Sequence, residues 1–99
     1  MRKARYLDRL PAAGPSALLV SAADKLYNAT AVLRDFRLVG AEVWTRFNPD
    51  AGRAGTIGYY RALADTFSRR LANPIADDLQ RIVALLERET GHRGTWPPE

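Results

Sequence analysis

The chain has no cysteine and only one histidine among its 99 residues. The absence of cysteine excludes a disulfide framework, a thiolate metal site and a cysteine nucleophile. No apolar run approaches the roughly 18 residues of a membrane span, and no continuous apolar stretch follows the basic amino terminus. We therefore expect neither a membrane segment nor a signal peptide, and a cytoplasmic protein.

The composition, 46% hydrophobic and 26% charged, is typical of a soluble globular protein. A chain of 99 residues is expected to form one domain, residues 1–99, at the small end of what can bury a core unaided. The net charge of +4 suits an anionic partner, although the sign alone does not say whether that partner is a nucleotide, a nucleic acid or neither. The chain shows no helix-turn-helix signature and no interleaving of aromatic and basic residues, so nucleic acid ranks last among the partners.

Apolar residues recur every three or four positions and nowhere in sustained alternation, which predicts an all-α fold with four to five helices. The expected helices cover residues 2–10, a long stretch ending at about residue 39, 41–47, 56–71 and 74–89, with a loop at 48–55 and a flexible tail at 93–99. The long helix is expected to start either at Ser16 or at Gly14 with Pro15 in its first turn. Gly40 is placed to end the long helix in a left-handed conformation, and Gly91 is placed to end the last helix. Thr56 and Asn73 are placed as amino-terminal caps, the latter followed by Pro74 as the first helical residue. One side of the last helix is expected to be solvated: Asp77, Asp78, Gln80, Arg81, Glu87 and Arg88.

The stretch 17–33 organises this pattern, because twelve of its seventeen residues are apolar when Ala and Tyr are counted. A helix that is apolar on most of its circumference is usually buried. Its main packing stripe is expected to be Leu19, Ala22, Ala23, Leu26, Leu33 and Phe36. A carboxylate buried in such a helix costs several kcal/mol unless it is compensated, so Asp24 is the residue to explain.

Asp24 and Asn28 are four residues apart and share one helix face, and Lys25 lies about 100° further round. A carboxylate, an amide and an ammonium group in this arrangement could bind a metal–phosphate or metal–nucleotide group. The alternative is structural: Asp24 pairs with a cation from another helix, and Asn28 bonds to backbone. The residues alone leave both interpretations open.

The string LLVSAADKLYNATAVLRDF resembles the helix of HD-domain metal-dependent phosphohydrolases, especially the alarmone (guanosine tetraphosphate) hydrolases, which carry a motif of the form A-D-[KR]-L-x-N. The later segments VWTRFN and GTIGYYRAL are similar to the same family in order and spacing, and the likeness covers roughly residues 17–87. The resemblance implies a helical fold like the C-terminal half of an HD domain. It also implies that Asp24 is a ligand of a divalent metal, often manganese, that Asn28 lies against the nucleotide sugar, and that Lys25 lies at the edge of the pocket.

The family's other site residues have no counterpart in this chain. The family needs a first histidine, a His-Asp pair and a catalytic Glu-Asp pair, whereas the chain has only His92, near its end, and no His-Asp dipeptide. A threonine that bifunctional members place seven residues after the aspartate is Ala31 here. A catalytic metal normally takes three or more protein ligands, so we expect no catalytic residue in this chain, and a bound manganese only if another chain supplies the missing ligands.

Two functional hypotheses follow. In the first, the chain is a fragment or split half of an HD-family phosphohydrolase acting on guanosine tetraphosphate-like nucleotides, inactive alone and completed by a second polypeptide. In the second, it is a small helical interaction module without enzymatic activity. A helix built to be buried then exposes an apolar face, and two copies associate through it as a homo-oligomer.

Overall fold

The computed structural model describes residues 2–46 and 52–94, and within these ranges all regular structure is helical. The elements in chain order are α1 (Arg2–Arg9), the 3₁₀ helix η1 (Leu10–Ala12), α2 (Pro15–Val39), the 3₁₀ helix η2 (Gly40–Arg46), α3 (Gly52–Arg70) and α4 (Pro74–Thr90). The all-α prediction is confirmed. No helix in the described part of the chain combines the length and apolarity needed to cross a bilayer.

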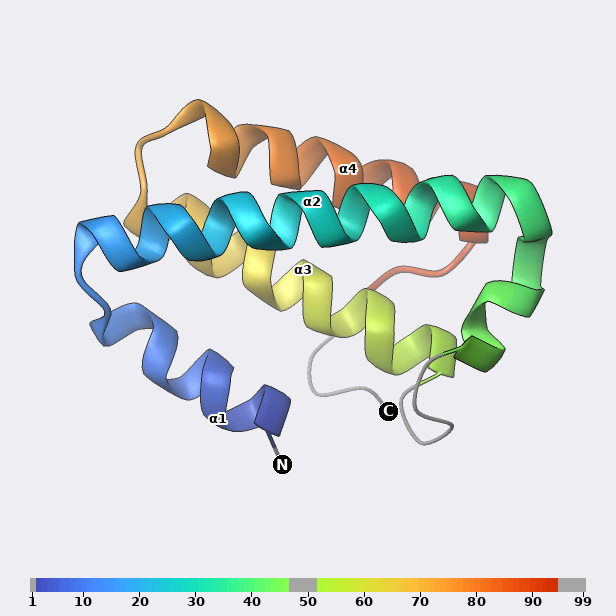
Figure 1. The fold of residues 1–99 in the computed structure, drawn as a ribbon, viewed down its shortest axis with the longest axis horizontal. Helices are drawn as coiled ribbons and strands as arrows, with labels where there is room; N and C mark the ends of the chain where they lie inside the picture. Colours follow the sequence, from blue (N-terminus) through green and yellow to red (C-terminus); the bar gives the residue numbers. More distant parts are fainter. Residues whose placement is uncertain (1, 47–51, 95–99) are drawn as a thin grey trace.

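Helix α2 spans the whole molecule. Its 25 residues correspond to about 37 Å of helix, close to the longest dimension of 36 Å. Helix α4 lies beside α2 and runs in the same direction, α3 runs in the opposite direction behind them, and α1 folds back below (Figure 1). Near the ends of the two parallel helices, Arg37 Nε donates to Glu89 Oε1 at 2.8 Å, which ties α2 to α4.

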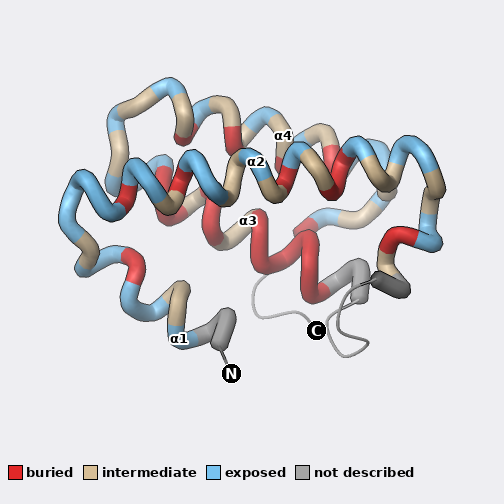
Figure 2. The backbone as a smooth tube through the Cα atoms, viewed as in Figure 1, coloured by how far each residue is buried: buried red, intermediate tan, exposed pale blue. Residues whose placement is uncertain are grey.

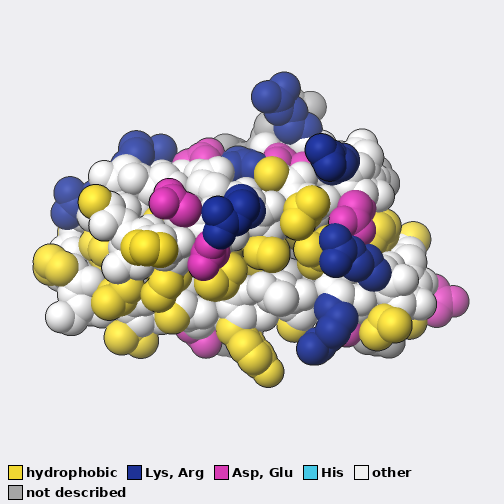
Figure 3. Space-filling view, turned by 90° about the horizontal axis from the view of Figure 1, so that it is seen from above, with side chains coloured by type: hydrophobic (Ala, Val, Ile, Leu, Met, Phe, Trp, Pro, Cys, Tyr) yellow, Lys and Arg dark blue, Asp and Glu magenta, His cyan; other side chains and the backbone are white. Residues whose placement is uncertain are grey.

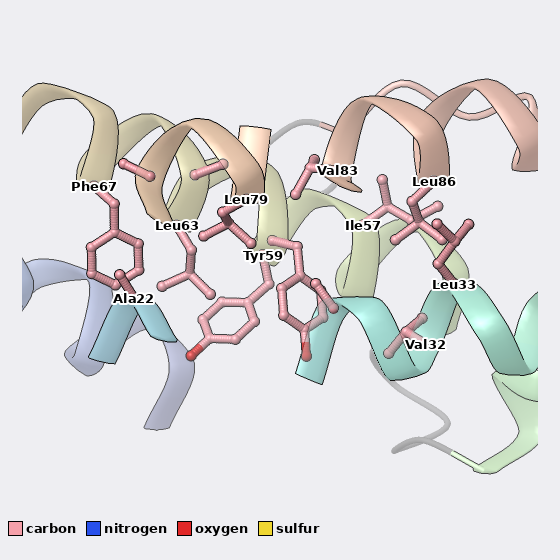
Figure 4. Close-up of a cluster of buried hydrophobic side chains, with 14 of the residues drawn as sticks. Ala22, Val32, Leu33, Ile57, Tyr59, Leu63, Phe67, Leu79, Val83 and Leu86 are labelled. Carbon is pink, nitrogen blue, oxygen red and sulfur yellow. The ribbon is translucent and has the colours of Figure 1, made fainter. Parts of the chain in front are cut away.

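The core lies between α2, α3 and α4, and α3 carries much of it (Figure 2). Figure 4 shows the buried side chains converging from the three helices, among them Ala22, Leu33, Ile57, Leu63, Phe67, Leu79, Val83 and Leu86. Burying one large apolar side chain contributes about 1.5–3 kcal/mol, so this three-helix contact is the main source of stability. Trp44 of η2 packs at its margin, 5.8 Å from the ring of Phe36.

Local signals placed several helix ends correctly. Asn73 Oδ1 accepts from the Ile75 N–H at 2.9 Å ahead of Pro74, and Gly91 ends α4 in the left-handed region with φ 67° and ψ 22°. Gly40 ends α2 with a positive φ of 66°, but its ψ of −144° lies outside the predicted left-handed helical region. That combination is essentially restricted to glycine.

The packing stripe of α2 differs from the predicted one. Leu18 is buried while Leu19 is 37% exposed, and Ala23 is exposed. The buried side of the helix consists of Leu18, Ala22, Ala29, Val32 and Leu33. Because the helix is apolar on most of its circumference, its sequence pattern is compatible with burial of either of two adjacent faces. The contacts with α3 and α4 decide which of the two faces is buried.

Helix α3 begins at Gly52 rather than at Thr56, inside the segment predicted to be a loop. Thr56 is therefore not a cap; it lies within the helix and is 2% exposed. Glycine costs about 1 kcal/mol in a helix, but residues 55–60 are all buried, and this burial outweighs the cost. The remainder of the predicted loop, residues 48–51, lies outside the described residues, as does Phe47.

The outer side of α4 is less solvated than predicted. Glu87 Oε2 accepts from Arg61 Nε of α3 at 3.3 Å, and Arg61 Nη1 donates to Gln80 at 2.6 Å. The Gly94 N–H donates to Glu87 Oε2 at 2.7 Å, and Gly94 is buried. The segment predicted as a tail thus packs as far as Gly94, and residues 95–99 lie outside the described part.

Candidate functional site

Asp24 lies on the side of α2 turned away from the core, which corrects the expectation of a buried carboxylate. Its side chain is 65% exposed, whereas that of Lys25 is 19% exposed. The two are joined by an ion pair of 3.9 Å between Lys25 Nζ and Asp24 Oδ2, a pair of neighbours within one helix. An exposed carboxylate stays well hydrated, so Asp24 needs no compensating group in the chain as it stands.

Lys25 is enclosed by two aromatic rings. Its Nζ lies 4.9 Å from the ring centre of Tyr6 in α1 and 6.0 Å from that of Tyr59 in α3. An ammonium group over a tyrosine face is attracted by the ring quadrupole, and the apolar stem packs against the same rings. Lys25 therefore links α1, α2 and α3.

Asn28 lies one turn beyond Asp24 and is half-buried, as is Ala31. Residues four apart on a helix are neighbours, so the carboxylate and the amide are adjacent at the margin between the exposed and the buried side. Tyr27, in contrast, is 74% exposed. The helix thus places Asp24 and Asn28 on neighbouring positions of one face, and Lys25 lies about 100° round the axis from Asp24, toward the buried side.

Two adjacent tyrosines of α3 complete the surroundings. The rings of Tyr59 and Tyr60 are 5.8 Å apart and inclined by 55°. Burial raises the pKa of Tyr59 to about 12, and the nearby Tyr6 and Tyr60 add to it. Burial likewise raises the pKa of Tyr60 to about 12, with a further contribution from the negative charge of Asp24. Both phenols are therefore neutral at physiological pH.

A cleft of about 570 Å³ opens between α1–η1 and the α2–α3 pair. Arg5 and Arg9 of α1 contribute its basic side, and Ser21 contributes a hydroxyl group. The aromatic walls are Tyr6 and Tyr59, the same rings that enclose Lys25, so the ammonium group lies at the border of the cleft. Cationic groups over an aromatic and apolar floor suit an anionic ligand with a flat ring.

The described residues do not by themselves fit a catalytic metal. Nowhere in residues 2–46 and 52–94 do three or more His, Asp or Glu side chains gather as a metal site would require. Asp24 supplies one carboxylate, and His92 lies at the opposite end of the sequence, where its backbone N–H bonds to Glu87. A divalent ion at Asp24 needs ligands from outside these residues.

No family model, curated protein or solved structure matches the chain. The HD-type interpretation therefore depends on the sequence motif and on the arrangement of Asp24 and Asn28.

Two features were not predicted as parts of a site. The cleft depends on α1 packing against Tyr59, a contact between segments fifty residues apart that no local pattern reveals. Its only sequence signals are the basic amino terminus and the tyrosine pair. The second feature is the identity of the exposed apolar side chains: an exposed apolar face was expected, but not that Val20, Tyr27 and Leu38 of α2 form it.

Proposed function

We propose that the chain is one half of an HD-type phosphohydrolase site for guanosine tetraphosphate-like nucleotides. In this proposal it supplies Asp24 and Asn28, and a second polypeptide supplies the histidines and the catalytic acid. The observation that carries the proposal is the exposed carboxylate of Asp24, one turn from an amide, on the side of α2 that residues 2–46 and 52–94 leave uncovered.

The electrostatics of the neighbouring surface support a nucleotide as the substrate class. Arg5 and Arg9 line the adjoining cleft, and Lys25 borders it. Phosphate groups favour such guanidinium groups, which bind phosphate oxygens in a bidentate manner. Tyr6 and Tyr59 line the same cleft beside them.

Asp24 also constrains the second polypeptide. Any surface that covers this side of α2 removes the carboxylate from water, which is unfavourable unless a cation accompanies it. A divalent metal held by histidines of the covering half provides that cation. The part of the chain that the structure describes offers too few ligands, and we expect the chain to be inactive without its complement.

The test is a fusion in which the histidine-bearing half of a stand-alone alarmone hydrolase precedes Arg2. We expect the fusion to bind manganese and to hydrolyse guanosine tetraphosphate. Asp24→Asn removes a ligand while keeping the shape, and should lower kcat/KM by about 100-fold or more. Calorimetric titration with manganese measures the binding independently of activity.

Asp77→Asn is the matched control, because it makes the same change at an exposed position of α4. It should leave manganese affinity and hydrolysis unchanged. A fusion that folds, as judged by circular dichroism, yet neither binds manganese nor hydrolyses the nucleotide contradicts the proposal. Activity that is equal in the Asp24→Asn fusion contradicts it as well.

A further inference from the structure

Three large apolar side chains lie in a line along the outer side of α2. Val20, Tyr27 and Leu38 are 71%, 74% and 75% exposed. Eighteen residues make five helical turns, so Val20 and Leu38 point in the same direction, and Tyr27 lies within about 20° of them. In Figure 1 α2 lies in front of α3 and α4, and Figure 3 shows apolar side chains along the corresponding edge.

The positions between these residues complete a regular row, which we call the α2 row: Val20, Asp24, Tyr27, Ala31, Arg34 and Leu38. The spacing alternates four and three residues, as in the a and d positions of a coiled coil. Two of the six carry opposite charges, and their side chains are 65% (Asp24) and 69% (Arg34) exposed. Each is joined to its chain neighbour, Lys25 or Asp35, by an ion pair of 3.9 Å.

The α2 row is complementary to itself in the antiparallel direction. When two copies of α2 cross at the level of Ala29, Val20 faces Leu38 of the other copy and Asp24 faces Arg34. The large Tyr27 then faces the small Ala31. In the parallel direction Asp24 would face Asp24 and Arg34 would face Arg34, which is unfavourable.

We propose that two copies of this chain pair through the α2 row as an antiparallel, two-fold symmetric dimer. Each interface then holds two Asp24–Arg34 ion pairs with an apolar pair at either end. The exposed apolar residues are covered, and the carboxylate of Asp24 gains a cation at the same moment.

This dimer goes beyond the proposed function and does not depend on it. The second copy would occupy the side of α2 that the histidine-bearing half needs, so the two assemblies exclude each other. The dimer is tested on the chain alone and the phosphohydrolase half on the fusion, so the failure of one is distinguishable from the failure of the other.

The first test is charge exchange, read by sedimentation equilibrium of the full chain. Asp24→Arg replaces each of the two Asp24–Arg34 ion pairs by two arginines that face each other, and should weaken the dimer by about tenfold or more. Arg34→Asp should weaken it similarly. The double variant restores opposite charges in the same register and should recover most of the affinity, which a merely structural effect of either substitution would not produce.

Ala84→Arg adds a cation to an exposed position of α4 and is the control. It should leave the dimer intact. A chain that is monomeric at every concentration accessible to sedimentation overturns the proposal, and so does a double variant no tighter than the single ones.

The second test determines the direction of the helices. The chain has no cysteine, so introduced thiols report without background. Val20→Cys and Leu38→Cys should form a disulfide when the two variants are mixed, and neither should do so alone. In the antiparallel dimer two copies of residue 20 are about 27 Å apart along the helix. Efficient cross-linking of Val20→Cys with itself indicates parallel packing and overturns the proposal.

Discussion

Asp24 was expected to be buried, yet its side chain is 65% exposed, whereas the side chain of the neighbouring Lys25 is only 19% exposed. The carboxylate is the more exposed of the two, and the ammonium group is enclosed by Tyr6 and Tyr59. A lysine stem of four carbons can lie along aromatic surface while its charge contacts the ring faces. The short side chain of aspartate has no such stem, and the carboxylate of Asp24 stays hydrated on the outer side of α2.

The buried phenol of Tyr60 should make the free energy of unfolding fall at alkaline pH. Its pKa is about 12 in the folded chain, mainly because of burial, against about 10 when unfolded. A raised folded pKa means that its contribution is complete below pH of about 10 and is lost between about 10 and 12. Tyr60→Phe should therefore flatten the decline of unfolding free energy over that range, measured by urea unfolding.

Asp24→Asn provides the companion measurement. Removing its negative charge should lower the pKa of Tyr60, which tyrosinate absorbance records. Asp77→Asn, on the exposed side of α4, should leave that titration unchanged. A Tyr60→Phe variant with the alkaline profile of the unsubstituted chain would contradict the assignment.

Arg61 is the polar residue on which the contact of α3 with α4 depends most. Its guanidinium bonds Glu87, Gln80 and Asp65, and the hydrogen bond to Glu87 is the main cause of its raised pKa. Arg61→Ala leaves a half-buried carboxylate without its cation and should cost about 2 kcal/mol. Arg81→Ala, at an exposed ion pair with Asp78, should cost less than about 0.5 kcal/mol in the same denaturation experiment.

Among the elements, α4 is the one whose boundaries were most predictable. Its start depends on a single side chain, since Asn73 Oδ1 accepts from the Ile75 N–H. Asn73→Ala should lower the unfolding free energy by about 1 kcal/mol, and Asn73→Ser, which keeps a cap, should lose much less. Equal losses in the two variants would show that the cap is not what stabilises this end.

The contrast with α2 and α3 shows what sequence can and cannot predict. Helix caps depend on contacts within four residues, so the sequence correctly predicted that Asn73 starts α4 and that Gly91 ends it. The choice of Leu18 over Leu19, and the helical state of residues 52–55, depend on partners far along the chain. The same holds for the site: the spacing of Asp24 and Asn28 was readable, whereas the exposure of Asp24 follows from which side of α2 packs on α3 and α4.

At the scale of the whole molecule, the described carboxy-terminal segment is part of the packed structure. A Cβ added to Gly94 would lie 2.8 Å from both Arg61 Cβ and the Ile57 carbonyl oxygen. Gly94→Ala should displace this segment, break the bond to Glu87 and cost about 1–3 kcal/mol. Nothing lies within 4 Å of a Cβ at Gly14, the N-cap of α2, so Gly14→Ala should lose only the capping preference, about 0.5–1 kcal/mol, and should leave the bond from Gly94 to Glu87 intact.

The effect of added manganese on Tm tests whether the chain binds a divalent metal through Asp24 without a second polypeptide. A ligand at 1,000 times its Kd stabilises by about 4 kcal/mol, which raises Tm by well over 10 °C in a domain of this size. We expect manganese or a chelator to leave Tm unchanged, because the described residues supply Asp24 alone. The dimer does not alter this: its two Asp24 residues are about 15 Å apart along the helices, too far to share an ion. A manganese-dependent rise in Tm that Asp24→Asn abolishes would show that the chain holds the metal unaided.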